Sequence, residues 1–133
     1  MNALCAKRLE PHDLTLPQWV VLSCIWRDGP LRITTISNMM RSGVPATSRI
    51  VARMQERGLL YRKPSGDDGR VSVVDVTKAG QALDHLSDFH EQINDALFDG
   101  FSASEKSLAF DMLERLRSNA ETALETDMTD TGR

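Results

Sequence analysis

Two short β-prone segments within an otherwise helical sequence constrain the fold of this 133-residue chain most strongly. Residues 59–63 and 71–76 are rich in strand-favouring side chains, and residues 64–69 (PSGDDG) between them are turn formers. This arrangement predicts a β-hairpin with a projecting tip. Because a lone hairpin is only marginally stable in water, the helices on either side must supply most of the core.

Helices are predicted on both sides of the hairpin. Apolar periodicity and helix-start signals predict four helices before it, over residues 4–9, 16–28, 35–41 and 45–57. After it, a long helix is expected from Thr77 to Gly100, and residues 102–105 (SASE) form a capping box that begins the last helix. We expect residues 126–133 to be a disordered tail.

The helix over residues 45–57 has two distinct sides. Its spacing predicts a buried apolar side formed by Ile50, Val51 and Met54. Its arginines recur every four residues and stack on one side: Arg49, Arg53 and Arg57. Two short helices at a tight turn, followed by a hairpin, make a winged helix-turn-helix. The second of these helices fits the major groove of double-stranded DNA, while the hairpin reaches along the DNA backbone.

Charge is unevenly distributed along the chain. Residues 30–80 carry nine basic and four acidic groups, a net charge of +5, whereas residues 81–133 carry a net charge of -8. A basic middle segment favours a polyanionic partner. An ordinary solvated face on each segment is the alternative.

Composition excludes several other classes of protein. The longest apolar run, residues 19–22, is far shorter than the ~18 residues needed to cross a bilayer. The first eight residues lack the basic-then-apolar order of a signal peptide, and two cysteines are too few for a disulfide framework. The sequence therefore predicts a single cytoplasmic domain with no membrane contact.

Three stretches resemble the MarR family of transcriptional regulators: residues 14–22 (LTLPQWVVL), 48–60 (SRIVARMQERGLL) and 64–73 (PSGDDGRVSV). The resemblance covers roughly residues 14–125. It implies a mostly α fold with a small β-hairpin wing, flanked by helices that form a dimer layer. Residues 14–76 would be the DNA-binding part, and residues 1–13 and 77–125 the dimerisation part. The implied function is a homodimeric, sequence-specific regulator that represses from a palindromic site in double-stranded DNA.

The resemblance also implies roles for six residues of the recognition helix: Pro45, Ala46, Thr47, Ser48, Arg49 and Arg53. The first two and Arg49 would face the major groove, with Arg49 in a bidentate contact to guanine. The other three would meet phosphates or pack. For the arginines of this helix, an ordinary solvated face is the alternative, above all for Arg57.

On the wing, the resemblance places the family's Asp-x-Arg signature at Asp68 and Arg70. Arg70 would enter the minor groove, and Asp68 would orient its guanidinium group. The alternative is an ion pair that only stabilises the hairpin.

The chain departs from the family pattern at several positions. Arg41 stands where the family often has glycine in the turn, and Gly43 would be a weaker N-cap than serine or threonine. Only about ten residues precede Pro11, where the family usually has a longer first helix. We therefore expect a dimer that is weaker, differently arranged, or built chiefly from the helices near 78–98 and 104–125.

Signals for sensing and catalysis are sparse. The resemblance implies release from DNA by a small, often aromatic acid, or by thiol oxidation. We expect Cys5 to be accessible, which would allow thiol oxidation; the alternative is that Cys5 has no role in sensing. We expect Cys24 to be packed. His85 and His90 do not share a helix face and His12 has no evident partner, so no metal site or cofactor is expected.

Enzymatic motifs are missing from the sequence, so we expect no catalytic activity. The alternative to a DNA-binding regulator is a winged-helix protein-interaction module without DNA binding of its own.

Overall fold

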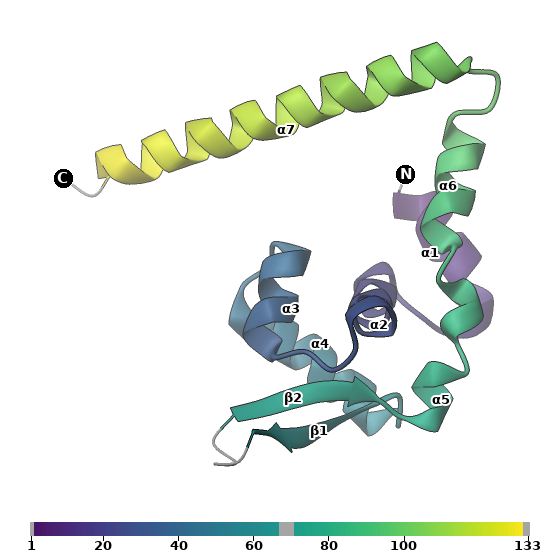
Figure 1. The fold of residues 1–133 in the computed structure, drawn as a ribbon, viewed down its shortest axis with the longest axis vertical. Helices are drawn as coiled ribbons and strands as arrows, with labels where there is room; N and C mark the ends of the chain where they lie inside the picture. The colour runs from purple at the N-terminus through teal and green to yellow at the C-terminus, as the bar shows by residue number, and fades with distance from the viewer. Residues whose placement is uncertain (1, 67–70, 132–133) are drawn as a thin grey trace. The chain divides into compact units, whose positions relative to one another are not determined.

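A computed structural model describes residues 2–66 and 71–131 of the chain (Figure 1). The chain forms two compact units, residues 1–90 and 91–133. The first unit contains, in order, α1 (Asn2–Leu9), the 3-10 helix η1 (Glu10–His12), α2 (Leu16–Asp28), α3 (Ile33–Met40), α4 (Val44–Glu56), β1 (Leu60–Ser65), β2 (Val71–Val76), α5 (Lys78–Gln81) and the 3-10 helix η2 (Asp84–Leu86). The second contains most of α6 (Phe89–Leu97) and all of α7 (Ala103–Thr131). The predicted organisation as one domain stays a prediction.

The predicted fold class is confirmed: the chain is mostly helical, with one two-stranded hairpin. The four helices before the hairpin lie within two residues of their predicted bounds. Their apolar sides form the core of the first unit, together with the strands. Its fully buried large side chains are Leu9, Val21, Leu22, Ile36, Thr47, Val51, Met54 and Val74.

The turn between α3 and α4 has a strained residue at its start. Arg41 ends α3 with a φ of +54°, in the left-handed region. The Ser42 N–H donates to the Ser37 carbonyl oxygen at 3.1 Å, and the buried Ser37 hydroxyl donates back to the Ser42 carbonyl oxygen. Gly43 then serves as the N-cap of α4 without a side-chain hydrogen bond, as predicted. A residue other than glycine costs about 1–2 kcal/mol in this left-handed conformation, which explains why glycine is favoured at the position of Arg41.

The strands β1 and β2 form the predicted antiparallel hairpin, with Leu60 opposite Val76. Val74 also exchanges two backbone hydrogen bonds with Leu31, of 3.0 and 2.7 Å, so the segment before α3 pairs with β2. The sequence did not predict this bridge, because a single paired residue leaves no periodic pattern. Residues 67–70 lie outside the described residues.

The prediction of one long helix over residues 77–100 is wrong, because α5, η2 and α6 occupy this segment separately. Two indole groups of α2 hold the interrupted segment. Trp26 Nε1 donates to the Gly80 carbonyl oxygen at 3.1 Å, and Trp19 Nε1 donates to the Leu86 carbonyl oxygen at 2.9 Å. Because packed indole N–H groups need acceptors, these two tertiary hydrogen bonds fix the backbone of this segment against α2.

The last helix, α7, begins with the predicted capping box. The Ser102 hydroxyl accepts from the Glu105 N–H at 3.1 Å, and the Glu105 carboxylate accepts from the Ser102 N–H at 2.8 Å. The helix continues to Thr131, whereas a disordered tail was expected from residue 126. Residues 120–131 contain neither glycine nor proline, so nothing in their sequence ends the helix.

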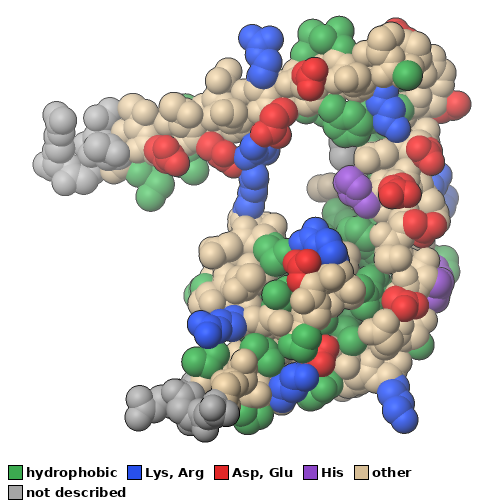
Figure 2. Space-filling view, in the orientation of Figure 1, with side chains coloured by type: hydrophobic (Ala, Val, Ile, Leu, Met, Phe, Trp, Pro, Cys, Tyr) green, Lys and Arg blue, Asp and Glu red, His purple; other side chains and the backbone are tan. Residues whose placement is uncertain are grey.

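Large apolar side chains are exposed along α7. Six of them are 52–66% exposed: Leu108, Met112, Leu113, Leu116, Leu124 and Met128. We call this set the α7 apolar residues. Figure 2 shows acidic side chains distributed along α6 and α7, in keeping with the negative charge of this part of the sequence. Within the described part of the chain, no helix combines the length and apolarity required to span a membrane.

Candidate nucleic-acid interface

Helix α4 divides its side chains between the core and an exposed face. Its fully buried side chains are Thr47, Val51 and Met54. Four others line one surface hollow of about 250 Å³: Ala46, Arg49, Ile50 and Arg53. Their spacing of three and four residues places them on the same side of the helix, and we call this side the arginine face. The side chains of Arg49 and Arg53 make no hydrogen bond or ion pair with any other residue that the structure describes, so both guanidinium groups can donate to an external acceptor.

The structure separates the six predicted recognition residues by exposure. Exposed side chains belong to Pro45, Arg49 and Arg53, and half-buried ones to Ala46 and Ser48. Thr47 differs from them, because it is fully buried and its hydroxyl donates to the Gly43 carbonyl oxygen at 3.0 Å. Of the two roles left open for Thr47, its burial and its hydrogen bond support packing.

Ile50 was expected in the core, and this expectation is wrong. It is half-buried and lies on the arginine face, next to the fully buried Val51. Successive helical residues are rotated by about 100°, so two adjacent apolar residues need not face the same way. The pattern missed Ile50 as a surface residue because an isoleucine within an amphipathic helix is normally assigned to the core.

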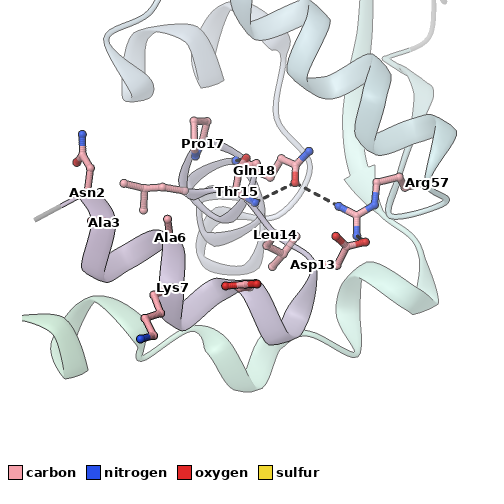
Figure 3. Close-up of a pocket in the computed structure, with 12 residues that line it drawn as sticks. Asn2, Ala3, Ala6, Lys7, Asp13, Leu14, Thr15, Pro17, Gln18 and Arg57 are labelled. Carbon is pink, nitrogen blue, oxygen red and sulfur yellow. Dashed lines mark hydrogen bonds and ion pairs between the residues drawn. The ribbon is translucent and has the colours of Figure 1, made fainter.

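Arg57 follows α4 as its C-cap and connects it to α2. Its guanidinium group donates to the Asp13 carboxylate and to the Gln18 amide oxygen, each at 3.2 Å (Figure 3). The same Gln18 oxygen accepts from the Thr15 N–H at 3.1 Å, within the capping box that begins α2. Arg57 is an exposed residue, as the solvated-face alternative expects, and its side chain is in addition held by two partners, unlike those of Arg49 and Arg53.

The wing residues Asp68 and Arg70 lie outside the described residues. On the adjoining strands, Lys63 Nζ donates to the Asp75 carboxylate at 3.1 Å. This hydrogen bond raises the pKa of Lys63, so the ammonium group stays charged. Lys63 and Asp75 thus form an ion pair between β1 and β2.

A second basic residue of β1 was missed by the sequence analysis. Arg62 Nε donates to the Gln55 amide oxygen of α4 at 3.1 Å. The contact links the wing directly to the candidate recognition helix. Its only sequence signal is that Arg62 occupies an exposed position of a strand, which is common to many arginines.

A pocket of about 1070 Å³ lies between α1, the start of α2 and Arg57 (Figure 3). Its apolar lining is formed by Ala3, Ala6, Leu14, Leu16 and Pro17. Its charged lining is formed by Lys7, Glu10, Asp13 and Arg57. The lining therefore combines an apolar surface with two cationic and two anionic side chains.

The cysteines and histidines give no sign of a reactive or metal site. Cys5 is 6% exposed on the same side of α1 as the buried Leu9, so the prediction that it is accessible is wrong. Cys24 is packed as predicted, and burial raises the pKa of its thiol. His12, for which no partner was expected, lies against His85 with ring centroids 5.7 Å apart. Among the described residues, no group of three or more potential ligands could hold a metal ion.

The fold and the arginine face define a winged helix-turn-helix protein. The family model described as "MarR family" matches residues 14–72. The HTH-type transcriptional repressor IacR of Pseudomonas putida is 31% identical over 115 residues, which are 86% of this chain and 69% of that protein. The chain belongs to the MarR family.

Solved structures share the fold. The structure of the transcriptional regulator SlyA matches with a TM-score of 0.81 and 20% identity, covering 93% of this chain and 88% of that one. A Staphylococcus aureus MepR–DNA complex matches with a TM-score of 0.78 and 19% identity, covering 90% of this chain and 88% of the other. At these identities the likeness concerns the fold alone.

Proposed function

We propose that this MarR-family protein is a transcriptional repressor that binds a palindromic site in double-stranded DNA as a homodimer. The observation that carries the proposal is the arginine face of α4. Two exposed guanidinium groups, of Arg49 and Arg53, stand one helical turn apart, without partners among the described residues. A helix with this face fits the major groove, where arginine can donate two hydrogen bonds to guanine.

Within this proposal, Arg49 contacts a guanine edge, while Arg53 and Ser48 contact phosphates. Pro45 and Ala46, at the start of α4, lie closest to the base edges, since recognition helices use their N-terminal residues for this contact. Arg70 of the wing enters the minor groove, and Asp68 orients its guanidinium group. The Arg62–Gln55 contact supports this role, because it ties the hairpin to α4 through an arginine whose described partner is neutral. The Lys63–Asp75 ion pair supports it by joining the two strands of the wing.

We propose a homodimer because one subunit presents only one recognition helix. A single recognition helix reads too few base pairs for specificity, and two-fold symmetry doubles the contacts on a palindrome. The α7 apolar residues support a helical dimer layer, because exposed apolar side chains in such number favour burial against another surface. We assign this layer to residues 1–13 and 77–125.

A small aromatic acid is the proposed effector, and we place it in the pocket beside Arg57. Its ring would cover the apolar lining, and its carboxylate would accept from Arg57 in place of Asp13. Because Arg57 follows α4 directly, this exchange would change how the end of α4 is held. Benzoate should weaken DNA binding, and neutral benzamide should not. Arg57→Gln, which lacks the ion pair with Asp13 from the start, should bind DNA more weakly than the unchanged protein and should no longer respond to benzoate.

We further propose that the protein works in the cytoplasm and has no enzymatic activity. The relative named above is a transcriptional repressor, which supports a regulatory rather than a catalytic role. The protein-interaction module without DNA binding is not favoured, because it gives no use to the unpartnered Arg49 and Arg53.

Fluorescence anisotropy with sheared double-stranded DNA at low and physiological salt tests the central proposal. Binding should fall steeply as salt rises, because cations are released from the phosphates. Arg49→Ala should weaken binding to a site selected from a random pool by about 1–3 kcal/mol. Arg70→Glu should abolish binding, whereas Arg27→Glu, at an exposed arginine of α2, should change it little. A folded dimer that binds no DNA at low salt would refute the proposal.

A further inference from the structure

Two apolar side chains sit among the arginines of the arginine face. Ala46 and Ile50 line the same hollow as Arg49 and Arg53, and both are half-buried. The core does not account for their position, because α4 faces it with other side chains that are fully buried. An apolar hollow between two cationic groups is suited to a partner with an apolar group beside hydrogen-bond acceptors.

The major groove of DNA offers this combination in one form. Guanine presents two acceptors to an arginine, and thymine alone among the four bases presents an apolar group, its C5-methyl. Resting on the DNA binding proposed above, we infer that Ile50, with Ala46, reads the methyl group of a thymine next to the guanine that Arg49 contacts. Cytosine at this position lacks the methyl group, so the apolar contact with Ile50 would not be made.

The geometry of α4 sets the distance between the two bases. Ala46 stands three residues before Arg49 and four before Ile50, which separates it from each by about 5–6 Å at Cβ. Ile50 directly follows Arg49 in the chain and lines the same hollow. Successive base pairs are about 3.4 Å apart. The thymine and the guanine must therefore lie within two base-pair steps of each other in each half-site.

The test uses the full-length protein and a duplex selected from a random pool. Each thymine is replaced in turn by uracil, which removes only the methyl group, and binding is measured by anisotropy. Replacing one thymine within two steps of the guanine should lower the affinity of the protein for the duplex about fourfold, which is the effect expected for burying one methyl group. This arm needs no protein variant, so it does not depend on the folding of a mutant.

Protein variants then assign the effect to Ile50. In Ile50→Ala the loss upon uracil replacement should disappear. In Val44→Ala, which shortens an exposed aliphatic side chain of α4 outside the hollow, the loss should persist. Ile50→Val, which keeps the branched shape, should retain most of it.

Two outcomes would overturn the inference while leaving the proposed function intact. The first is a selected duplex whose thymines near the guanine can all be replaced by uracil without loss. The second is a methyl dependence that persists unchanged in Ile50→Ala. Failure to bind any duplex would instead overturn the proposed function, and this inference with it.

Discussion

Replacing Gly80 by alanine should disrupt the junction between the hairpin and α5. A Cβ at this position would lie closer than 3.0 Å to the Leu59 carbonyl oxygen and 3.2 Å from Val76 Cβ. The carbonyl group cannot move freely, because it accepts from the Thr77 N–H at 3.0 Å. Relief of so close a contact therefore requires α5 to move as well, which strains the hydrogen bond from Trp26 Nε1 to the Gly80 carbonyl oxygen.

The size of the effect can be estimated from its parts. Overpacking against the backbone costs about 1–3 kcal/mol. Two weakened hydrogen bonds add about 1 kcal/mol each. The helix propensity of alanine over glycine offsets about 1 kcal/mol of this total. We therefore expect Gly80→Ala to lower the free energy of unfolding by about 3 kcal/mol.

Urea unfolding followed by tryptophan fluorescence measures this loss, since both tryptophans of the sequence, Trp19 and Trp26, lie in the first unit. Gly58→Ala is the matched control. Gly58 has a φ of +74°, and a methyl group added there would meet no atom within 4 Å, so this change adds only a backbone penalty of about 1–2 kcal/mol. A loss in Gly80→Ala that is no larger than in Gly58→Ala would refute the steric argument.

Three further predictions concern the turn, the helix cap and the thiols. Arg41→Gly should be about 1 kcal/mol more stable than Arg41→Ala in urea unfolding, because glycine relieves the left-handed strain; equal stabilities would contradict it. Hydrogen bonds from Ser102 lower the pKa of Glu105, so the cap should stabilise α7 above the unfolded-state pKa and weaken as pH falls through the folded value. NMR titration should show the lowered pKa, partly restored in Ser102→Ala. Burial raises the pKa of Cys24, so in Cys5→Ala a thiol reagent should react far faster after unfolding in urea; equal rates would argue against burial.

The helices before the hairpin could be predicted because their ends are written locally in the sequence. Pro17 lies in the first turn of α2, and Gly29 and Gly58 adopt positive φ just beyond α2 and α4. The turn formers between β1 and β2 likewise specify a hairpin without reference to the rest of the chain. Each of these signals acts over a few residues and therefore does not depend on tertiary contacts.

The features that escaped prediction depend on contacts between distant residues. The broken segment after α5 is held by Trp19 and Trp26, which donate to carbonyl groups 67 and 54 residues away. Arg57 finds Asp13 across 44 residues, and no local pattern marks this pair. At the candidate interface, the arginines could be predicted by spacing, but the position of Ile50 could not, because it depends on where the core lies around α4.

These contacts give α4 three separate attachments, and they determine how an effector could act on it. Fully buried side chains such as Val51 anchor one side of the helix, so sliding it would require repacking the core. Its C-terminal end is held at Arg57 by polar partners that line the proposed effector pocket, and Gln55 ties it to the wing. A ligand can weaken DNA binding only as far as it prefers a second arrangement of the helix. An effector that displaces Asp13 from Arg57 changes the polar contacts at the C-terminal end of α4 and leaves its buried side chains packed in the core. The expected motion of α4 is therefore a tilt about the core side chains rather than a translation. A tilt displaces Arg49 and Ile50 together, and the effector should therefore reduce both the guanine and the thymine preference in the same proportion.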